Sequence, residues 1–423
     1  MPSVTPMRVI AFRVSLLWIA TRVVALLSIF FTQRLMDDVR IYEGWMSFLG
    51  HRDFPLFDHK WQYPPGAGGF LLVPHLISDH YAVAFVTLMV FVDAGILCAL
   101  MLARFRTPQM SWQGVWLWAI AALVVGPIMF TRFDLLPTFF AVAAILLVAR
   151  PAMSGASAAI GLFTKVWPGV MVLVLPRPSL RRGLTSFVLT CVGLTVAFVV
   201  LFHNSFSFLG NQTARGLQVE SVGAIPYVIY HLTGQVVDVH LSYGSMQVTM
   251  AGAEFIGTAL TLLGLALIAV IAYWRLSGRL EHIPAGDVGL ALVLVCLATS
   301  RVYSPQFNIW IIGLACAALL SSATRMRRVA IILVAVSLLT QFVYPLFPSG
   351  LTDGSVLIGL VQVLRIVGLV TATCIAVWRI SPWRDLAQSP ERHGGGRSDV
   401  QGVDTASHGD SDDDIRSLQG TAR

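Results

Sequence analysis

Charge is scarce in this chain of 423 residues. Asp, Glu, Lys and Arg make up only 12% of it, whereas hydrophobic residues make up 56% and the mean hydropathy is +0.75. A soluble domain carries about twice that share of charge, so the composition excludes an ordinary soluble protein. Long apolar runs recur from residue 14 to residue 378, and this pattern predicts a polytopic, all-α membrane protein.

Three further absences narrow the possibilities. Lysine is nearly missing, with Lys60 and Lys165 alone, and the net charge of +7 comes from arginines in short clusters between apolar runs. That pattern is typical of cytoplasmic loops and does not indicate a nucleic-acid partner. No small-residue cleavage site follows the first apolar run, so we interpret it as a retained span. The lack of an internal repeat disfavours the inverted-repeat transporters.

Cysteines and histidines offer no metal template. All five cysteines fall inside apolar runs, where we expect small core residues and neither zinc ligands nor disulfides. The histidines near the first polar loop cluster only loosely, and their spacing matches no metal-binding motif. We therefore expect no metal and no cofactor.

The arginine clusters order the apolar runs into a topology. Arg8 and Arg13 precede the first span, residues 14–31, and predict a cytoplasmic N-terminus. The same rule predicts about twelve spans in a membrane-embedded domain of residues 1–380, including a short hairpin that turns near Lys165. Residues 381–423 are rich in glycine and aspartate, and we expect a disordered cytoplasmic tail there.

One apolar segment is too short to cross. Residues 66–77 follow Tyr63-Pro64-Pro65, and a crossing needs about 20 residues. Arg104 and Arg106, after the next run, stay inside only if residues 66–77 lie in the interface or re-enter the membrane. We therefore predict a re-entrant or interfacial helix.

This topology gathers polar residues on the extracytoplasmic side, several of them at span ends. Cations there run against the positive-inside rule, and charges near the bilayer are costly and usually functional. The set comprises Asp37, Asp38, Asp58, Arg132, Asp134, Lys165, Arg215, Glu220, Arg301 and Gln306.

The first outer loop predicts an amphipathic helix that begins at Asp38. Its apolar face is formed by Val39, Tyr42, Met46 and Leu49. Either Asp37 or Asp38 could simply be the helix N-cap, and we favour Asp37 for that position. Asp58 lies in a flexible stretch typical of a solvated loop.

The other outer charges allow alternatives. Arg132 and Asp134 could form a structural clasp or contact substrate. Lys165 has no carboxylate near it in sequence, so it suits an anionic headgroup or snorkels to the interface. Arg215 and Glu220 could pair with each other or bind hydroxyl groups. Cations beside a carboxylate at an outer face indicate chemistry on a phosphorylated lipid, in which the carboxylate takes a proton from an acceptor hydroxyl.

Six motifs occur in order along the chain. They are Asp38-Val39-x-x-Tyr42-x-x-Trp45, Gln62-Tyr63-Pro64-Pro65-Gly66, Arg132-x-Asp134-Leu135-Leu136-Pro137, Thr164-Lys165-x-Trp167-Pro168, Arg215-Gly216-Leu217-Gln218-x-Glu220-Ser221 and Ser304-Pro305-Gln306. Together they resemble the motifs of actinobacterial glycosyltransferase family 87, in the C-type glycosyltransferase superfamily, and the resemblance covers about residues 14–378.

The resemblance implies a C-type architecture in the cell membrane, a polyprenyl-phosphate-mannose donor, a glycolipid or glycan acceptor, an extracytoplasmic active site and inversion at the anomeric carbon. It also implies an aspartate base in the first outer loop, which by motif position is Asp38. Where the family has Glu-Tyr-Pro-Pro, this chain has Gln62, and the change favours a metal-independent site.

The remaining roles follow as expectations. The residues expected to bind the donor phosphate are Lys165, Arg215 and Arg301. Those expected to contact substrate are Tyr42, Tyr63, Arg132, Asp134, Trp167, Gln218, Glu220 and Gln306.

Two rival functions remain open. A lipid or solute transporter or flippase would use the same charges as a relay, but it needs ionisable groups near mid-span, and Arg22 alone was identified there. A non-catalytic assembly subunit would not need six intact motifs.

Overall fold

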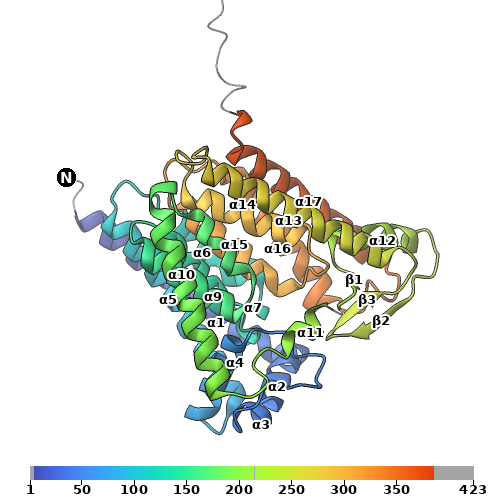
Figure 1. Cartoon of the computed structure of the whole chain (residues 1–423). Coiled ribbons are helices and arrows are strands. Elements are labelled where there is room, and N and C mark those ends of the chain that lie inside the picture. The colour runs from blue at the N-terminus through green and yellow to red at the C-terminus, as the bar shows by residue number, and fades with distance from the viewer. Residues whose placement is uncertain (1–3, 214, 385–423) are drawn as a thin grey trace, which may run out of the picture.

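The computed structural model describes residues 4–213 and 215–384, which fold mainly as helices (Figure 1). Most of the predicted tail, residues 385–423, lies outside the described residues. The expectation that this tail is cytoplasmic therefore concerns residues that the structure does not describe. The all-helical prediction holds for the bulk of the protein, and one small sheet is added to it.

Within residues 4–213 and 215–384, six helices are long and apolar enough to cross a membrane. Their exposed faces carry large hydrophobic side chains, as lipid-facing surfaces do. They are α1 (Val4–Phe31), α5 (Tyr81–Arg106), α10 (Arg177–Leu201), α13 (Ala253–Leu276), α16 (Arg327–Gln341) with its continuation η5 (Phe342–Leu346), and α17 (Val356–Ile380).

The predicted count of twelve spans is not confirmed, because several apolar runs form short helices. At 1.5 Å per residue, a helix of about 13 residues falls well short of a hydrocarbon core of about 30 Å. These short helices are α4 (Pro65–Ile77), α6 (Gln113–Val125), α8 (Leu135–Leu146), α14 (Ala285–Ala298) and α15 (Asn308–Leu319). Every residue of α15 and nearly all of α14 are buried by other helices. The hydrophobicity of α14 and α15 therefore results from burial inside the protein as much as from contact with lipid.

The predicted hairpin at Lys165 is present in a modified form. Helix α9 (Pro151–Thr164) ends immediately before Lys165, and the chain returns as the 3₁₀ helix η2 (Trp167–Val174). Gly169 abuts Leu162, so the two limbs pack closely. The turn holds the lysine at a helix end, facing the interior.

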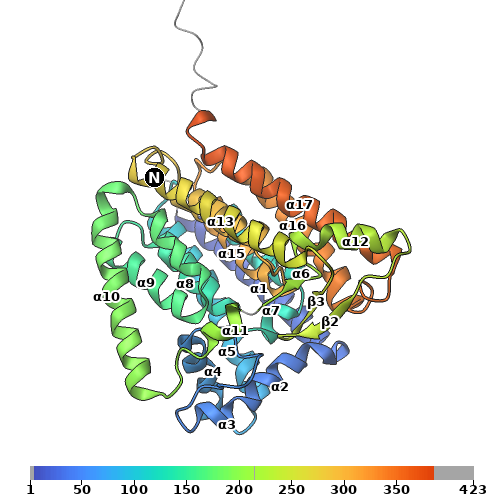
Figure 2. The same cartoon turned by 45° about the vertical axis from the view of Figure 1, so that its right-hand side comes forward.

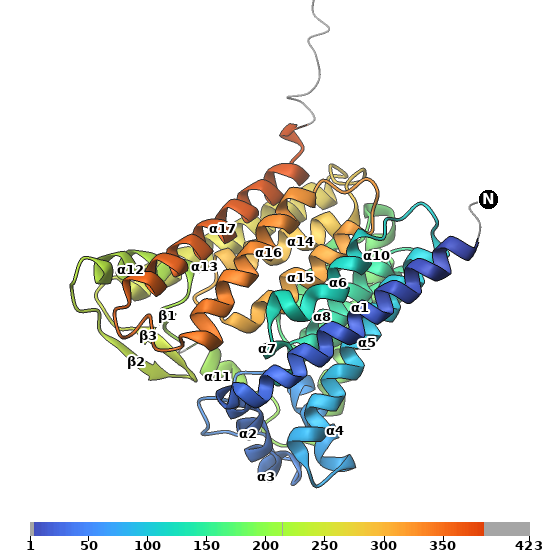
Figure 3. The same ribbon diagram turned by 180° about the vertical axis from the view of Figure 1, so that it is seen from behind.

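The polar loop after α1 forms two short helices, α2 (Asp37–Gly44) and α3 (Met46–Leu49), joined to α1 by η1 (Gln33–Met36). The single helix expected to begin at Asp38 therefore begins at Asp37 and is divided at Trp45. All of the predicted apolar face is buried. The interpretation of Asp37 as N-cap is wrong: Met36 occupies that position, and Asp37 instead pairs with Arg40 at 2.9 Å on the surface. In Figure 3, α1 begins and α17 ends on the upper side, whereas α2 and α3 lie at the opposite end.

Residues 217–248, between α10 and α13, contain the unpredicted sheet. Strand β3 (Ser245–Val248) pairs antiparallel with both β1 (Leu217–Gln218) and β2 (Val239–Ser242). The remaining described elements are the helices α11 (Phe208–Thr213) and α12 (Ile225–Leu232), the one-turn helix α7 (Ile128–Thr131), and the 3₁₀ turns η3 (Val222–Ala224) and η4 (Pro305–Phe307). Figure 2 shows the sheet on the same side of the molecule as α12, with α10 at the far edge.

A buried ion pair joins α1 to α5 at mid-helix. Arg22 donates to both carboxylate oxygens of Asp93, at 2.9 and 2.8 Å, and to the carbonyls of Trp118 and Ala119. Trp18 donates a further bond to Asp93. Arg22 thus packs α1 against α5. Such a fully partnered pair offers no relay of the kind that a transporter requires.

Candidate active site

A cavity of about 560 Å³ lies where α2, the Tyr63-Pro64 turn, the α9–η2 turn, α13, α14 and the β2–β3 hairpin converge. Among the predicted site residues it is lined by Asp38, Tyr42, Tyr63, Lys165, Trp167, Arg215, Arg301 and Gln306. A second, shallower space of about 760 Å³ lies on the outer face of α10, and its lining includes no carboxylate. The first cavity is therefore the candidate site.

Asp38 reaches the cavity from the first turn of α2, and its side chain is 36% exposed. It forms an ion pair with Arg132, which is buried behind the wall. Arg132 also donates to the carbonyl oxygens of Leu35 and Thr131, at 3.1 and 3.0 Å. The predicted Arg132–Asp134 clasp is absent. Arg132 instead orients Asp38, which lines the cavity.

Lys165 is not the lone ammonium that the sequence indicated. Its Nζ pairs with Asp134 Oδ1 at 2.7 Å. Four aromatic rings surround the ammonium, with centroids 4.7 to 5.6 Å away: Tyr63, Phe133, Phe307 and Trp310. Burial lowers the pKa of the Lys165 ammonium, and Asp134 opposes that shift. A charge held in this way is fixed in position at the edge of the cavity.

Asp134 lies behind this wall and does not line the cavity. Its Oδ1 also accepts a 2.7 Å bond from Trp310 Nε1. Trp310 was missed in the sequence because an indole inside an apolar run carries no sign of its partner. Asp134 therefore positions Lys165 and the Trp310 ring together.

Arg215 has no carboxylate partner among the described residues, unlike the cavity-lining cations Lys165 and Arg301. Its one hydrogen bond to a side chain, Nη2 to Ser245 Oγ, is long at 3.5 Å, and its buried Nε has no partner within residues 4–213 and 215–384. Burial lowers the pKa of the guanidinium, and Tyr63 opposes the shift. Arginine still stays charged, so a half-buried positive charge faces the cavity and favours an anion.

Arg301 differs from Arg215 because it already has a counter-charge. It donates to Glu254 Oε2 and to Thr258 Oγ1 on α13, both at 2.7 Å. It also donates to the carbonyl oxygen of Arg215 at 3.1 Å. Arg301 thus fastens the Arg215 backbone to α13 while bordering the cavity.

Gln218 and Glu220 brace the wall without lining it. Gln218 Oε1 accepts bonds from Tyr303 N and Ser304 Oγ, at 3.1 and 3.3 Å. Glu220 pairs with Arg365 at 2.9 Å, not with Arg215. Arg365 was missed, although a charge within the final apolar run is itself a signal of a buried role. Both side chains hold the loops that carry Arg215 and Gln306.

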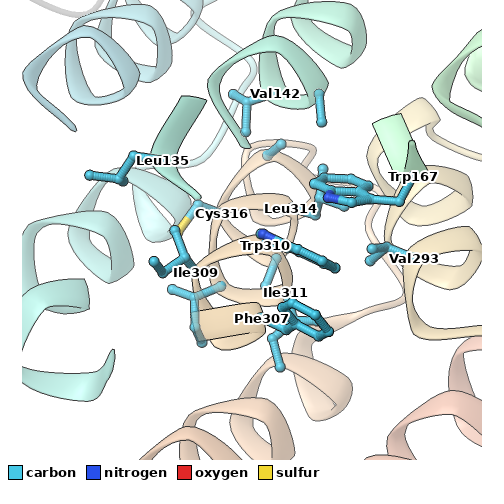
Figure 4. Close-up of a cluster of buried hydrophobic side chains, with 14 of the residues drawn as sticks. Leu135, Val142, Trp167, Val293, Phe307, Ile309, Trp310, Ile311, Leu314 and Cys316 are labelled. Carbon is cyan, nitrogen blue, oxygen red and sulfur yellow. The ribbon is translucent and has the colours of Figure 1, made fainter. Parts of the chain in front are cut away.

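Aromatic rings form much of the remaining wall. Phe307 and Trp310 stack with centroids 3.9 Å apart, and Trp167 stacks on Trp310 at 5.0 Å (Figure 4). Tyr63 packs edge-on against Phe133 at 4.7 Å, and burial raises the pKa of its phenol. These rings offer flat apolar surfaces beside polar groups, a pattern typical of carbohydrate and lipid contacts.

Gln62, which stands where the resembling family has a glutamate, uses its amide as a donor. Nε2 donates to the carbonyl oxygens of His59 and Tyr243, at 3.1 and 2.8 Å, and the side chain is 5% exposed. A carboxylate cannot donate either bond. The amide therefore ties the first outer loop to the tip of the β2–β3 hairpin.

We predict that Gln62→Glu destabilises the protein by about 1–3 kcal/mol. The buried carboxylate would face two carbonyl oxygens, and it has no N–H or O–H group to donate to either of them. The measurement is the thermal unfolding midpoint in detergent. Gln62→Met, which removes the bonds without adding charge, should unfold between wild type and Gln62→Glu. A Gln62→Glu midpoint equal to that of wild type would show that the two hydrogen bonds do not contribute to stability.

Within residues 4–213 and 215–384, no three His, Cys, Asp or Glu side chains gather as a metal site. A comparison with family models matches residues 61–305 to glycosyltransferase family 87. No curated protein and no solved structure matches the chain. The matched segment contains most of the cavity wall, from the Gln62-Tyr63 turn to the loop that carries Arg301.

Proposed function

Because the chain belongs to glycosyltransferase family 87, we propose that it transfers a mannosyl residue from a polyprenyl phosphate to a glycolipid or glycan, with inversion and with Asp38 as base. Membrane glycosyl transfer follows from the family and from the apolar helices. The donor, the acceptor, the cell membrane and the extracytoplasmic side of the reaction belong to the proposal.

One observation carries the proposal: the polarity of the cavity changes from one end to the other. Asp38, Tyr63 and Arg215 lie toward the outer loops, whereas the far wall comes from the apolar faces of α13 and α14, including Leu265 and Leu297. Leu265 lines the cavity while being 60% exposed, so the cavity opens on the apolar surface of α13. A polyprenyl-phosphate sugar has the same order of apolar chain, anion and hydroxyl groups.

The reaction needs a base and a leaving-group ligand. Asp38 accepts the proton of the acceptor hydroxyl as that oxygen attacks C1 of the sugar, and the bond between C1 and the phosphate oxygen breaks. The electron pair leaves with the polyprenyl phosphate. Arg215 binds the departing phosphate because its charge has no carboxylate partner among the described residues, and Lys165 adds a second fixed positive charge.

The other predicted residues divide into contacts and supports. Tyr42, Tyr63, Trp167 and Gln306 border the cavity and are proposed to contact substrate. Arg132, Asp134, Gln218 and Glu220 lie behind it, and we propose that they act by positioning Asp38, Lys165 and the two outer loops.

The function is tested by giving membranes that contain the protein a radiolabelled polyprenyl-phosphate mannose. We expect label in a glycolipid or glycan that is absent with control membranes. Transfer from a nucleotide sugar alone, with none from the lipid donor, would overturn the proposal. Protease-impermeable vesicles of known orientation would then report the side on which product forms.

We predict that Arg215→Gln raises the KM for the lipid donor at least about tenfold, because one charge-assisted contact to a phosphate is worth about 1.5–3 kcal/mol. The assay is initial transfer rate against donor concentration. Arg301→Gln is the matched control, since its guanidinium is already neutralised by Glu254, and its donor KM should change less. Equal effects of the two substitutions would remove the special role given to Arg215.

A further inference from the structure

The tip of the β2–β3 hairpin borders the candidate site. Ser242 pairs with Ser245, which leaves Tyr243 and Gly244 as a two-residue loop. Both have positive φ, 51° and 74°, the signature of a type I′ turn. Both residues line the cavity, and no role is given to them by the motifs described above.

The residue type at the first of these positions is unfavourable. A type I′ turn prefers Asn, Asp or Gly there, because a side chain in the left-handed region clashes with its own backbone. A tyrosine in this conformation costs free energy, and such strain gathers at functional sites when the surrounding structure holds it. The turn alone therefore gives no reason for a large aromatic ring.

The hairpin tip is held firmly at several points. Gln62 donates to the Tyr243 carbonyl at 2.8 Å, and the His59 ring lies edge-on to the Tyr243 ring at 5.7 Å. Gln247 donates to the Ser242 carbonyl at 3.1 Å and accepts from Gly216 N at 3.0 Å. The same strand places Ser245 Oγ against Arg215. The tip is thus coupled to the loop that carries the proposed phosphate ligand.

The position of the tip within the cavity indicates what it meets. It lies at the polar end with Lys60, Gln62 and Gln212, whereas the apolar opening is formed by α13 and α14. The donor chain occupies the apolar end in the proposed function, so the polar end is left for the second substrate. Within the described residues the Tyr243 hydroxyl has no hydrogen-bond partner. A half-buried ring with an unpartnered hydroxyl suits the face and hydroxyl groups of a pyranose.

We propose that Tyr243 and Gly244 form the acceptor subsite, with the Tyr243 ring as a stacking platform for the acceptor sugar. This inference rests on the proposed function. It assigns the hairpin a part in acceptor selection: a sugar-bearing acceptor binds between the tip and Asp38, and its hydroxyl is presented to the carboxylate. Arg215 and the apolar end serve the donor only.

The decisive variant is Tyr243→Asn. It deletes the ring and installs Asn-Gly, the pair that a type I′ turn favours most, so the hairpin should fold at least as well. Tyr243→Phe is the matched control, because it retains the ring and loses only the hydroxyl. Thermal unfolding of both variants verifies that the fold is retained.

The assay titrates a glycolipid and glycan extract of the enzyme's own membranes as acceptor, with the radiolabelled lipid donor held at saturation. Donor hydrolysis is followed in parallel without acceptor. We expect Tyr243→Asn to raise the half-saturating amount of acceptor at least about tenfold, with unchanged donor KM and hydrolysis, and Tyr243→Phe to stay within about threefold of wild type.

Two results separate the inference from the function on which it rests. If Tyr243→Asn saturates at the wild-type amount of acceptor, or changes donor KM instead, the acceptor subsite is wrong while lipid-dependent transfer stands. If the wild type neither transfers nor hydrolyses the lipid donor, the proposed function itself has failed.

Discussion

Replacing Asp38 with Asn should abolish sugar transfer while the protein still folds and inserts. A general base contributes about 10²–10⁴-fold to a rate, and an amide cannot take the proton of the acceptor hydroxyl. The substitution keeps the shape of the side chain and one oxygen for Arg132. We expect kcat for transfer to fall within that range, with the donor KM nearly unchanged. The assay is transfer of radiolabel from polyprenyl-phosphate mannose.

The neighbouring carboxylate provides a matched control. Asp37 precedes Asp38 in the same helical turn, but its side chain is 59% exposed and pairs with Arg40. An exposed pair of this kind is worth about 0–1 kcal/mol, so Asp37→Asn should retain activity and stability. Turnover by Asp38→Asn at the wild-type rate would exclude Asp38 as base. Equal loss in both variants would point to a general effect of charge at the start of α2.

Replacing Lys165 with Met should damage both stability and activity. It leaves the Asp134 carboxylate buried, with its side chain 1% exposed and only Trp310 as a side-chain donor. Removing one partner of a buried ion pair costs about 3–5 kcal/mol. Loss of a fixed charge near the departing phosphate should lower kcat by about 10²–10³-fold. Unfolding in detergent and the transfer assay measure the two effects.

The double variant Lys165→Met/Asp134→Asn separates these effects. It removes both charges and keeps an oxygen to accept from Trp310, so much of the lost stability should return. Activity should remain low, because the positive charge at the cavity is still missing. Recovery of activity together with stability would mean that Lys165 serves only the fold.

A second buried pair controls for the general cost of removing charges. Arg22 and Asp93 are equally buried but lie away from the cavity. Arg22→Met/Asp93→Asn should lower the unfolding midpoint and leave the kcat of the folded fraction near that of wild type. A comparable loss of kcat would indicate that packing between α1 and α5, and not the charge at Lys165, limits the reaction.

Much of the candidate site could be predicted from the sequence because the motifs mark it locally. The apolar face of α2, the turn at Lys165 and the Tyr63-Pro64-Pro65 turn depend on neighbouring residues, whose spacing is visible in the chain. Family membership rests on the match of residues 61–305 to the family model. Buried charges in a lipid-soluble chain are conspicuous, since each is costly without a function or a partner.

The partners of those charges could not be predicted. Arg132 pairs with Asp38 and not with Asp134 two residues away, Lys165 takes Asp134, and Glu220 takes Arg365 from the last helix. An ion pair is decided by distance in space, which sequence spacing reports only within a helix or a strand. For this reason the sequence left three outer cations equivalent, whereas the fold leaves Arg215 without a counter-charge among the described residues.

The sequence by itself determined that this is a helical membrane protein and indicated many of the residues that line its cavity, because hydrophobicity and motif order are properties of the chain. Tertiary structure alone decided the number of long helices. An apolar run must be shielded from water, but either lipid or other helices can shield it, and α15 is buried by other helices. It also decided the charge partners and the position of the hairpin at the cavity. Both depend on contacts between segments far apart in the chain, and those contacts exist only once the helices have packed.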